Sequence, residues 1–316
     1  MLSKAALDVL DALHTGGTAT PAELADMTGY SQTHLYEVLD TLVGAGVLTE
    51  TRRNKNQRYI RAADHLIVDT YRRLVSQLGH VDWTELLSPA RLRVCWYLDE
   101  PRRVAEIADR LHITRQAVHN ALSPFKGRAM LSPAGPEYAL SDDLAPLLAF
   151  ARAVVSHAHR QRLREVAPSA TIVWCDPKRA LVRPQTAADT DRLQSDPDWQ
   201  VTGLARMQDF ELQFYLAAEP AFWYGPETTL TPAEIVCHTL VLDSDTRRIS
   251  YALLLIAQLG IEYETLTATA GWYDLEPTVE GLYQGLDGEI TSAADAAVSL
   301  PSDAEFMRLK EQYGVS

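Results

Sequence analysis

Hydrophobic residues in the first sixty positions recur at the spacing of amphipathic helices and then change to the spacing of strands. Over residues 4–14 they fall every three or four positions, which predicts a helix with one apolar face. Thr20-Pro21-Ala22-Glu23 has the cap, proline and glutamate order that opens a helix, and Ser31 is placed to cap a longer one. Residues 47–51 and 57–60 then have the composition of two strands joined by a polar turn. The pattern predicts three helices followed by a hairpin.

The same pattern returns 83 residues further along the chain without a gap. Residues 22–26 (AELAD) align with residues 105–109 (AEIAD), and Val47-Leu48 aligns with Met130-Leu131. At this offset Thr114 takes the capping position of Ser31. A repeat of this length, with its cap and apolar positions kept, predicts two domains of one kind in tandem.

Basic charge is concentrated in the first predicted hairpin. Residues 51–61 contain five basic and no acidic side chains. Residues 168–316, in contrast, hold 23 of the 42 acidic and nine of the 29 basic residues, a net charge of −14. Because DNA binding needs positive potential, we expect double-stranded DNA to bind to the N-terminal half and not to the C-terminal half.

The third predicted helix begins with the polar run Ser31-Gln32-Thr33-His34-Leu35-Tyr36-Glu37-Val38-Leu39. The turn that follows this helix contains Gly46-Val47-Leu48. With these residues, positions 4–61 resemble the winged-helix domains of MarR and ArsR type transcription regulators, and Thr114-Arg115-Gln116-Ala117-Val118 fits the same pattern. The resemblance implies a recognition helix in the major groove and a basic wing on phosphate or in the minor groove. The predicted DNA contacts are Ser31, Gln32, Thr33, His34 and Tyr36 in the first recognition helix, Arg52, Arg53, Lys55 and Arg58 in the first wing, and Thr114, Arg115, Gln116, His119 and Asn120 in the second recognition helix.

Winged helices also serve as protein-docking modules, and the sequence leaves this alternative open. Protein docking is more plausible for the second copy than for the first, because the predicted wing of the second copy has little charge besides Lys126 and Arg128. Whether the second copy binds DNA is therefore left open by the sequence.

Amphipathic helices are predicted at residues 62–78 and 142–166, where they can pair two subunits in a homodimer or dock a flanking domain. After Pro168 the pattern changes to short strands mixed with helices, with strands expected at 171–175, 180–183, 210–217 and 221–224. We therefore predict a mainly α fold with α+β parts. It comprises two winged helix-turn-helix domains, residues 1–80 and 81–167, followed by an acidic α+β domain, residues 168–316.

The sequence offers no residue set that is specific for catalysis, a metal or a cofactor. It lacks the GxGxxG, P-loop and GxSxG patterns, and Asp243-Ser244-Asp245 is best interpreted as a helix cap. His238 lies on an apolar helix face, as core histidines do, and Cys95, Cys175 and Cys237 lie far apart in apolar contexts. These observations predict core thiols, no cofactor, no metal site and no enzymatic activity.

The longest apolar run is far shorter than the roughly 20 residues of a membrane-spanning helix, and residues 1–14 lack the pattern of a secretory signal. We expect a cytoplasmic protein without membrane contact. Five lysines stand against 24 arginines, and aspartate is abundant, which indicates a proteome adapted to high salt such as that of a haloarchaeon.

Residues 201–206 and 230–240 are similar to AbiEi-type antitoxins, which join a winged helix to a domain that neutralises a nucleotidyltransferase toxin. The leading hypothesis is a sequence-specific transcription regulator whose C-terminal domain senses a small-molecule effector or binds a protein partner. Repression is favoured over activation, and the sequence leaves the direction of regulation open. The alternatives are an antitoxin-like protein that neutralises a toxin and autoregulates its operon, and an enzyme with DNA-targeting domains.

Overall fold

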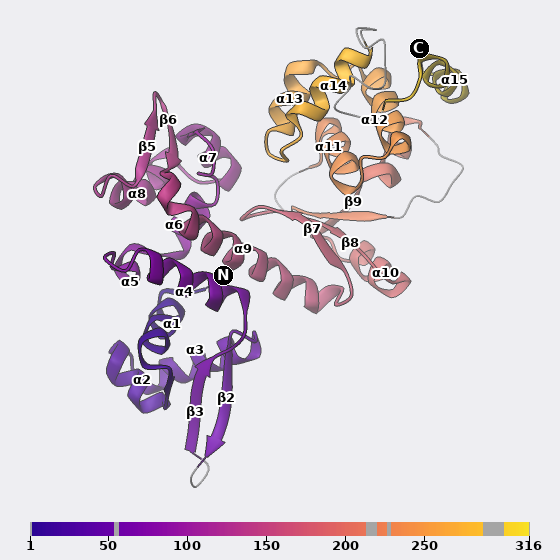
Figure 1. Ribbon diagram of the computed structural model, residues 1–316. Helices are drawn as coiled ribbons and strands as arrows, with labels where there is room; N and C mark the ends of the chain where they lie inside the picture. The colour runs from indigo at the N-terminus through magenta and orange to yellow at the C-terminus, as the bar shows by residue number, and fades with distance from the viewer. Residues whose placement is uncertain (1, 54–56, 213–219, 226–228, 287–299, 316) are drawn as a thin grey trace. The chain divides into compact units, whose positions relative to one another are not determined.

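The structure is a computed structural model that describes residues 2–53, 57–212, 220–225, 229–286 and 300–315 (Figure 1). These residues are mainly helical and carry small antiparallel sheets, as expected of an α+β fold. The chain divides into two compact units, Met1–Gln161 and Arg162–Ser316, which we call unit 1 and unit 2. The predicted boundaries between residues 80 and 81 and between 167 and 168 stay predictions.

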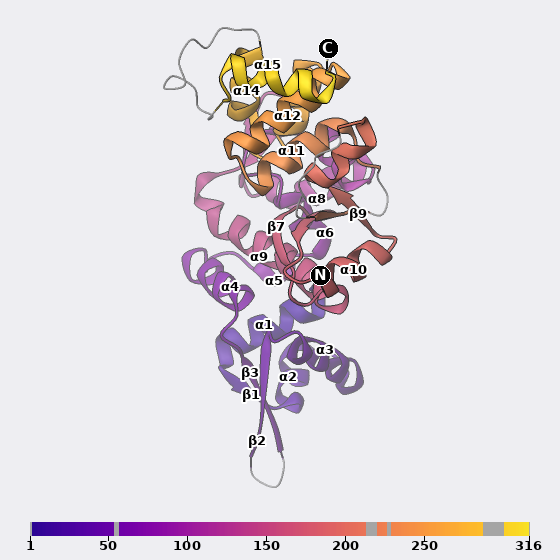
Figure 2. The same ribbon diagram turned by 90° about the vertical axis from the view of Figure 1, so that its right-hand side faces the viewer.

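Unit 1 begins with three helices and a three-stranded sheet. Figures 1 and 2 show the β2–β3 hairpin projecting from the helices. β1 pairs with β3, with Thr18 opposite Arg61, so the strand before α2 lies beside the hairpin. Leu24, Leu35 and Leu39 are fully buried and form the centre of this part. The elements are α1 (Lys4–Gly16), β1 (Thr18–Ala19), α2 (Pro21–Thr28), α3 (Gln32–Gly44), β2 (Leu48–Arg53) and β3 (Gln57–Ala62).

The same order of elements occurs a second time in unit 1. α7 and α8 begin 83 residues after α2 and α3, respectively, as the sequence repeat predicts. Ile107, Val118 and Phe125 are fully buried at the positions equivalent to Leu24, Leu35 and Leu42 of the first copy. The elements are α6 (Pro89–Cys95), β4 (Arg102–Arg103), α7 (Val104–Leu111), α8 (Arg115–Lys126), β5 (Leu131–Ala134) and β6 (Glu137–Leu140).

The remaining helices of unit 1 follow each hairpin. The ring of Tyr71 on the first of them lies 5.4 Å from the ring of Phe150 on the last, centroid to centroid, which packs these two helices together. Their apolar residues recur at helical spacing, so the predicted amphipathic helices are confirmed with slightly shorter bounds. The elements are α4 (Leu66–Gln77), α5 (Trp83–Leu86), the 3₁₀ helix η1 (Asp142–Leu144) and α9 (Ala145–Val166), whose last five residues belong to unit 2.

Unit 2 contains a four-stranded antiparallel sheet that is covered on both faces. Opposite Val182 lies Phe222, and opposite Leu181 lies Trp223. The first pair packs with Leu163, while the second pair packs with the helices that follow. The sheet order is β7-β8-β10-β9. This part of unit 2 comprises β7 (Thr171–Cys175), β8 (Ala180–Arg183), α10 (Ala187–Ser195), β9 (Trp199–Thr202), the 3₁₀ helix η2 (Gly203–Phe210) and β10 (Ala221–Tyr224).

One predicted strand of unit 2 is wrong at its start. The sequence predicts a strand over residues 210–217, but Phe210 ends the 3₁₀ helix η2, and residues 213–217 lie outside the described residues. The apolar residues Leu204 and Met207 of η2 pack against the core of unit 2, and this tertiary packing decides the local conformation.

Five helices complete the described part of unit 2. Thr231 and Glu234 form the predicted capping box of the first of them, and Asp245 caps the second, which confirms that Asp243-Ser244-Asp245 contains a helix cap. The helices are α11 (Pro232–Leu242), α12 (Thr246–Leu259), α13 (Tyr263–Ala270), α14 (Glu276–Leu286) and α15 (Asp303–Tyr313). None of the helices among the described residues has both the length and the apolar character needed to cross a membrane.

Candidate nucleic-acid interface

The start of α3 is held by a side-chain cap and presents polar side chains to solvent. Ser31 accepts a hydrogen bond from the backbone N–H of His34 at 3.4 Å, as the sequence predicts for an N-cap. Gln32, Thr33 and Tyr36 are exposed, and Tyr36 keeps 44% of its surface accessible. An exposed helix start with amide, hydroxyl and phenol groups can read base edges or bind phosphate.

His34 is also exposed but lies on a different side of α3. Its ring contacts the Tyr30 ring edge to face, with 5.4 Å between the centroids, and it lines a groove shared with α1 and α9. The structure therefore separates this predicted contact from the other exposed residues at the start of the helix.

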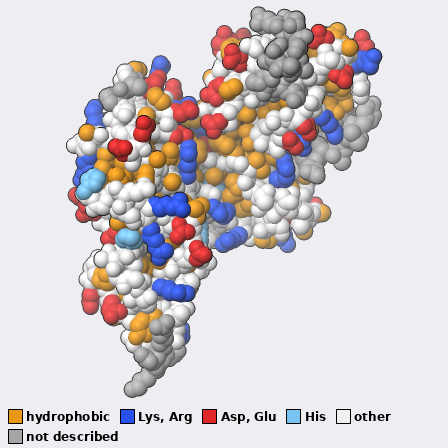
Figure 3. Space-filling model, viewed as in Figure 1, with side chains coloured by type: hydrophobic (Ala, Val, Ile, Leu, Met, Phe, Trp, Pro, Cys, Tyr) orange, Lys and Arg blue, Asp and Glu red, His pale blue; other side chains and the backbone are white. Residues whose placement is uncertain are grey.

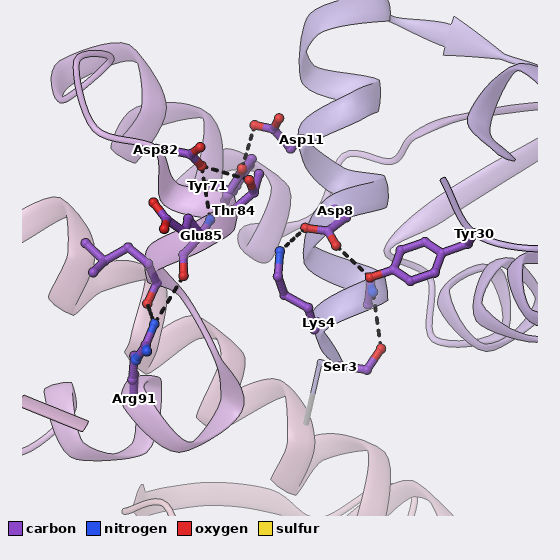
Figure 4. Close-up of polar contacts among 12 residues, drawn as sticks. Ser3, Lys4, Asp8, Asp11, Tyr30, Tyr71, Asp82, Thr84, Glu85 and Arg91 are labelled. Carbon is purple, nitrogen blue, oxygen red and sulfur yellow. Dashed lines mark hydrogen bonds and ion pairs between the residues drawn. The ribbon is translucent and has the colours of Figure 1, made fainter. Parts of the chain in front are cut away.

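The position of α3 is fixed by a hydrogen bond to α1 (Figure 4). The Tyr30 hydroxyl, one residue before the cap, donates to the Asp8 carboxylate at 2.7 Å, and Lys4 pairs with the same carboxylate. This hydrogen bond is the main reason that the pKa of Tyr30 is raised to about 12. The phenol therefore stays protonated and keeps its donor at neutral pH.

A second tyrosine joins α4 to α1 in the same way. The Tyr71 hydroxyl donates to Asp11 at 2.8 Å, and its ring is buried (Figure 4). Burial first, and then the hydrogen bond to Asp11, raise the pKa of Tyr71 far above its ordinary value. The two tyrosines thus brace α1 against the elements on either side of it.

The hairpin β2–β3 carries its basic side chains in different environments. Arg58 of β3 donates to Asp40 of α3 at 2.6 Å, and its Nε lies 2.8 Å from the Glu50 carboxylate in an ion pair without hydrogen-bond alignment. Its guanidinium also lies 5.6 Å from the centre of the Tyr36 ring. Only 16% of the Arg58 side chain is exposed, so this residue joins the hairpin to α3.

Arg52 differs from Arg58 in its exposure. It donates to Glu50 at 3.1 Å but keeps 59% of its side chain accessible, so it can still reach a phosphate. The side chain of Arg53 and the whole of Lys55 lie outside the described residues. Two of the four predicted wing contacts therefore have described side chains. Arg52 is exposed, and Arg58 is largely covered.

Sequence reasoning missed the acidic partners Asp40 and Glu50. A signal for Glu50 was present, because residues two apart on a strand share a face and Arg52 is the cross-strand partner of Arg58. Asp40 lies 18 residues from Arg58, and only the packing of the hairpin on α3 brings them together.

The start of α8 matches that of α3 in capping and exposure. Thr114 accepts a hydrogen bond from the Ala117 N–H at 3.1 Å, as predicted for its cap. Arg115 and His119 are exposed, and Gln116 donates to Asn120 at 2.9 Å one turn further along the same face. The pair presents amide donors and acceptors on one exposed face of the helix, and such groups suit base edges in the major groove.

The basic side chains around the second hairpin each contact an acidic or aromatic side chain. Arg103 pairs with Glu137 at 3.3 Å across the sheet, and the Lys126 amine lies 5.7 Å from the centre of the Tyr138 ring. Arg128 pairs weakly with Glu85 at 3.6 Å. These contacts agree with the low charge that the sequence shows for this hairpin.

Acidic and basic side chains are interspersed over unit 1 on the face shown in Figure 3. Residues 1–167 hold 20 of the 29 basic and 19 of the 42 acidic residues, so their charges nearly cancel. Any positive potential for DNA must therefore be local, at the exposed arginines of the first hairpin and of α8.

Unit 2 contains a buried polar cluster around His238, which is fully buried as predicted for a core histidine. Its Nδ1 lies 2.7 Å from the Thr202 hydroxyl and its Nε2 lies 2.9 Å from the Tyr273 hydroxyl. The Trp223 ring lies 4.3 Å from the His238 ring, centroid to centroid. Among the described residues, no group of three His, Cys, Asp or Glu side chains is placed to hold a metal ion.

Cys95, Cys175 and Cys237 form no disulfide bond. Cys95 and Cys237 are buried, which confirms them as core thiols, whereas Cys175 is half-buried in β7. Burial raises the pKa of Cys95 to about 12, so this thiol is protonated and unreactive at neutral pH.

Two family models match parts of the chain. Residues 1–63 match the O-methyltransferase dimerisation domain, and residues 196–315 match a family described as HVO_2833_C, C-terminal. No curated protein matches the chain. The first match supports a homodimer, since it is to a domain that pairs subunits. The resemblances to MarR and ArsR type regulators and to AbiEi-type antitoxins stay predictions.

The first match also overturns one prediction made from the sequence. We predicted from the lack of catalytic motifs that the protein is not an enzyme. A dimerisation domain of O-methyltransferases points instead to a methyltransferase family, whose members are enzymes. The prediction was wrong because a dimerisation module has no catalytic motif of its own, so the lack of such motifs says nothing about this relationship.

Proposed function

We propose that the protein binds double-stranded DNA through α3, α8 and the β2–β3 hairpin, and that it regulates transcription as a homodimer. In this proposal each copy of the repeated element order is a winged helix-turn-helix. The observation that carries it is the pair of capped, exposed helix starts at equivalent places of the two copies, at Ser31 and Thr114. A helix-turn-helix that reads sequence uses such a helix, with base-reading side chains near its N-terminus.

Different side chains have different roles in this proposal. Gln32, Arg115 and the Gln116–Asn120 pair read bases, because amides suit adenine and arginine suits guanine. Arg52 holds phosphate from the hairpin. Arg58 positions the hairpin on α3 and does not itself contact DNA, because its charge is already paired with two carboxylates.

The test is fluorescence anisotropy with the DNA upstream of the protein's own gene and with a shuffled duplex of equal length. Wild type is expected to prefer the upstream DNA. Arg115→Ala and Gln32→Ala are each expected to lose about 1–3 kcal/mol of that preference, since a good bidentate base contact contributes this much discrimination.

Arg160→Ala is the matched control, because Arg160 is an exposed arginine of α9 whose guanidinium bonds to Ser156 at 2.9 Å. It is expected to leave the preference unchanged. Equal binding of both duplexes by wild type contradicts sequence-specific regulation, and no binding of either points to protein docking.

A second candidate function rests on the match of residues 1–63 to the O-methyltransferase dimerisation domain. It is methyl transfer, with this segment pairing two copies of the chain. The test is calorimetric titration of the full-length protein with S-adenosylmethionine, the methyl donor used by most methyltransferases. Saturable binding supports this candidate, and its absence at millimolar ligand counts against it.

A further inference from the structure

Unit 1 contains a groove that runs along α3 from His34 to Ala45, between the start of α1 and the second half of α9. Its volume is about 480 Å³ and its lining is more apolar than polar. Cavities of about 300–1,000 Å³ hold small organic molecules in proteins, so the groove has the size of a ligand site. All of its lining residues belong to unit 1.

Apolar side chains form most of the groove's accessible surface, and polar side chains such as Ser3 and Thr41 lie among them. Leu2, Val38 and Leu42 are buried and line the groove together with Ala158 of α9. Among the described residues that line the groove, Glu37 of α3 is the one with a formal charge at neutral pH, counting histidine as neutral. No ion pair to Glu37 occurs within the described part of the chain, although the other carboxylates of α3 and β2 are paired with arginine.

Neighbouring polar groups shape the ends of the groove. The Gln161 amide donates to the Ala45 carbonyl at 3.2 Å, which ties α9 to the end of α3. Gln161 also lies 3.4 Å from His157, whose ring contacts His65 at 4.9 Å between centroids. These residues already have partners, whereas Glu37 is exposed to solvent, so its carboxylate is open to a ligand that enters the groove.

We propose that this groove binds a small organic amine. Its ammonium group pairs with Glu37, and its apolar body lies against the leucine, valine and alanine side chains. A carboxylate bordered by apolar walls favours a cation and repels an anion, and a charge-assisted hydrogen bond is stronger than a neutral one. Glu37 and His34 lie on α3, so a ligand in the groove restricts the motion of this helix. A resulting change in DNA affinity rests on the proposed function.

The probes are three indoles that differ in charge but share the ring. They are tryptamine, which is cationic, indole-3-ethanol, which is neutral, and indole-3-acetate, which is anionic. Calorimetric titration of the full-length protein is expected to show tryptamine binding at least about tenfold more tightly than indole-3-ethanol, and indole-3-acetate more weakly still.

Two variants test the site itself. Glu37→Gln is expected to remove the tenfold preference for tryptamine, and Ala158→Trp to abolish binding of all three probes by filling the groove. Asp26→Asn is the control, because it makes the same charge change at an exposed position of α2 away from the groove. Circular dichroism and thermal melting of each variant verify that it is folded.

The proposal is overturned if wild type shows no saturable tryptamine binding at millimolar concentration, or if Glu37→Gln binds tryptamine as wild type does. These titrations contain no DNA, so they fail or succeed independently of the proposed function. A further anisotropy titration, with tryptamine added to the DNA complex, then tests the effect on α3. An unchanged DNA affinity removes only the regulatory role of the amine.

Discussion

Replacement of Arg58 by alanine tests whether this residue joins the β2–β3 hairpin to α3. The variant loses a hydrogen-bonded ion pair with Asp40, an ion pair with Glu50 and a cation–π contact with Tyr36. Each ion pair contributes about 0.2–1 kcal/mol near a surface, and the cation–π contact contributes about 0.5–1 kcal/mol. We expect the free energy of unfolding to fall by about 1–3 kcal/mol.

Urea denaturation followed by circular dichroism measures this change, read from the transition midpoint and its slope. Arg72→Ala is the control, because Arg72 of α4 is half exposed and lies 3.9 Å from Asp69. It is expected to change the free energy of unfolding by less than about 0.5 kcal/mol. If Arg58→Ala is no less stable than the control variant, Arg58 does not hold the hairpin in place.

The same variant distinguishes a positioning residue from a phosphate contact. A positioning residue changes DNA affinity while leaving its salt dependence intact, because the number of released counterions stays the same. A phosphate contact of Arg58 instead lowers the slope of log affinity against log salt by about 0.9. A reduced slope with normal stability thus refutes the assignment of Arg58 to the hairpin–helix contact.

Three further changes have defined outcomes. Tyr30→Phe removes the hydrogen bond to Asp8 and is expected to cost up to about 1 kcal/mol at pH 7. Because the folded pKa of Tyr30 is raised to about 12, this contribution is present below pH 10 and disappears as pH rises towards 12, which urea denaturation across that range measures. Tyr273→Phe removes the hydroxyl that lies 2.9 Å from buried His238 and is expected to destabilise unit 2 by about 1–3 kcal/mol, measured by thermal melting. Gly29→Ala places a side chain at φ 73°, where the end of α2 needs a left-handed residue, and is expected to cost about 1 kcal/mol by urea denaturation.

Local sequence signals predicted the helix starts well. The caps at Ser31 and Thr114 and the capping box at Thr231 depend on residues three apart, so they can be recognised in the sequence. The repeat likewise predicted that α7 and α8 would follow α2 and α3 at a constant spacing. These features are decided by hydrogen bonds within a single turn of helix.

Contacts between distant elements could not be predicted in the same way. The bond from Gln161 to Ala45 joins residues 116 positions apart and forms one end of the groove, yet neither residue has an unusual local context. The bond from Tyr71 to Asp11 spans 60 positions. Periodicity indicates which face of a helix is buried, but it does not identify the element that covers this face.

Composition alone also limited what could be inferred about function. The acidic excess of residues 168–316 led us to expect DNA binding in the N-terminal half, where Arg52 and Arg115 are exposed. It could not reveal that Glu50 and Asp40 neutralise part of the hairpin, because charge counts ignore pairing. The relation of residues 1–63 to an O-methyltransferase dimerisation domain required comparison with a family.

The most direct test of the central claim is the salt dependence of DNA binding. Affinity for the upstream DNA is measured from about 50 to 200 mM salt for wild type and for a variant with Arg52, Arg53 and Lys55 replaced by alanine. We expect wild type to bind with a steep negative slope of log affinity against log salt. The slope of the variant is expected to be shallower by about 0.9 for each phosphate that these side chains neutralise in wild type. Identical slopes for the two proteins contradict a wing that holds phosphate, and no binding by wild type at low salt contradicts DNA binding altogether.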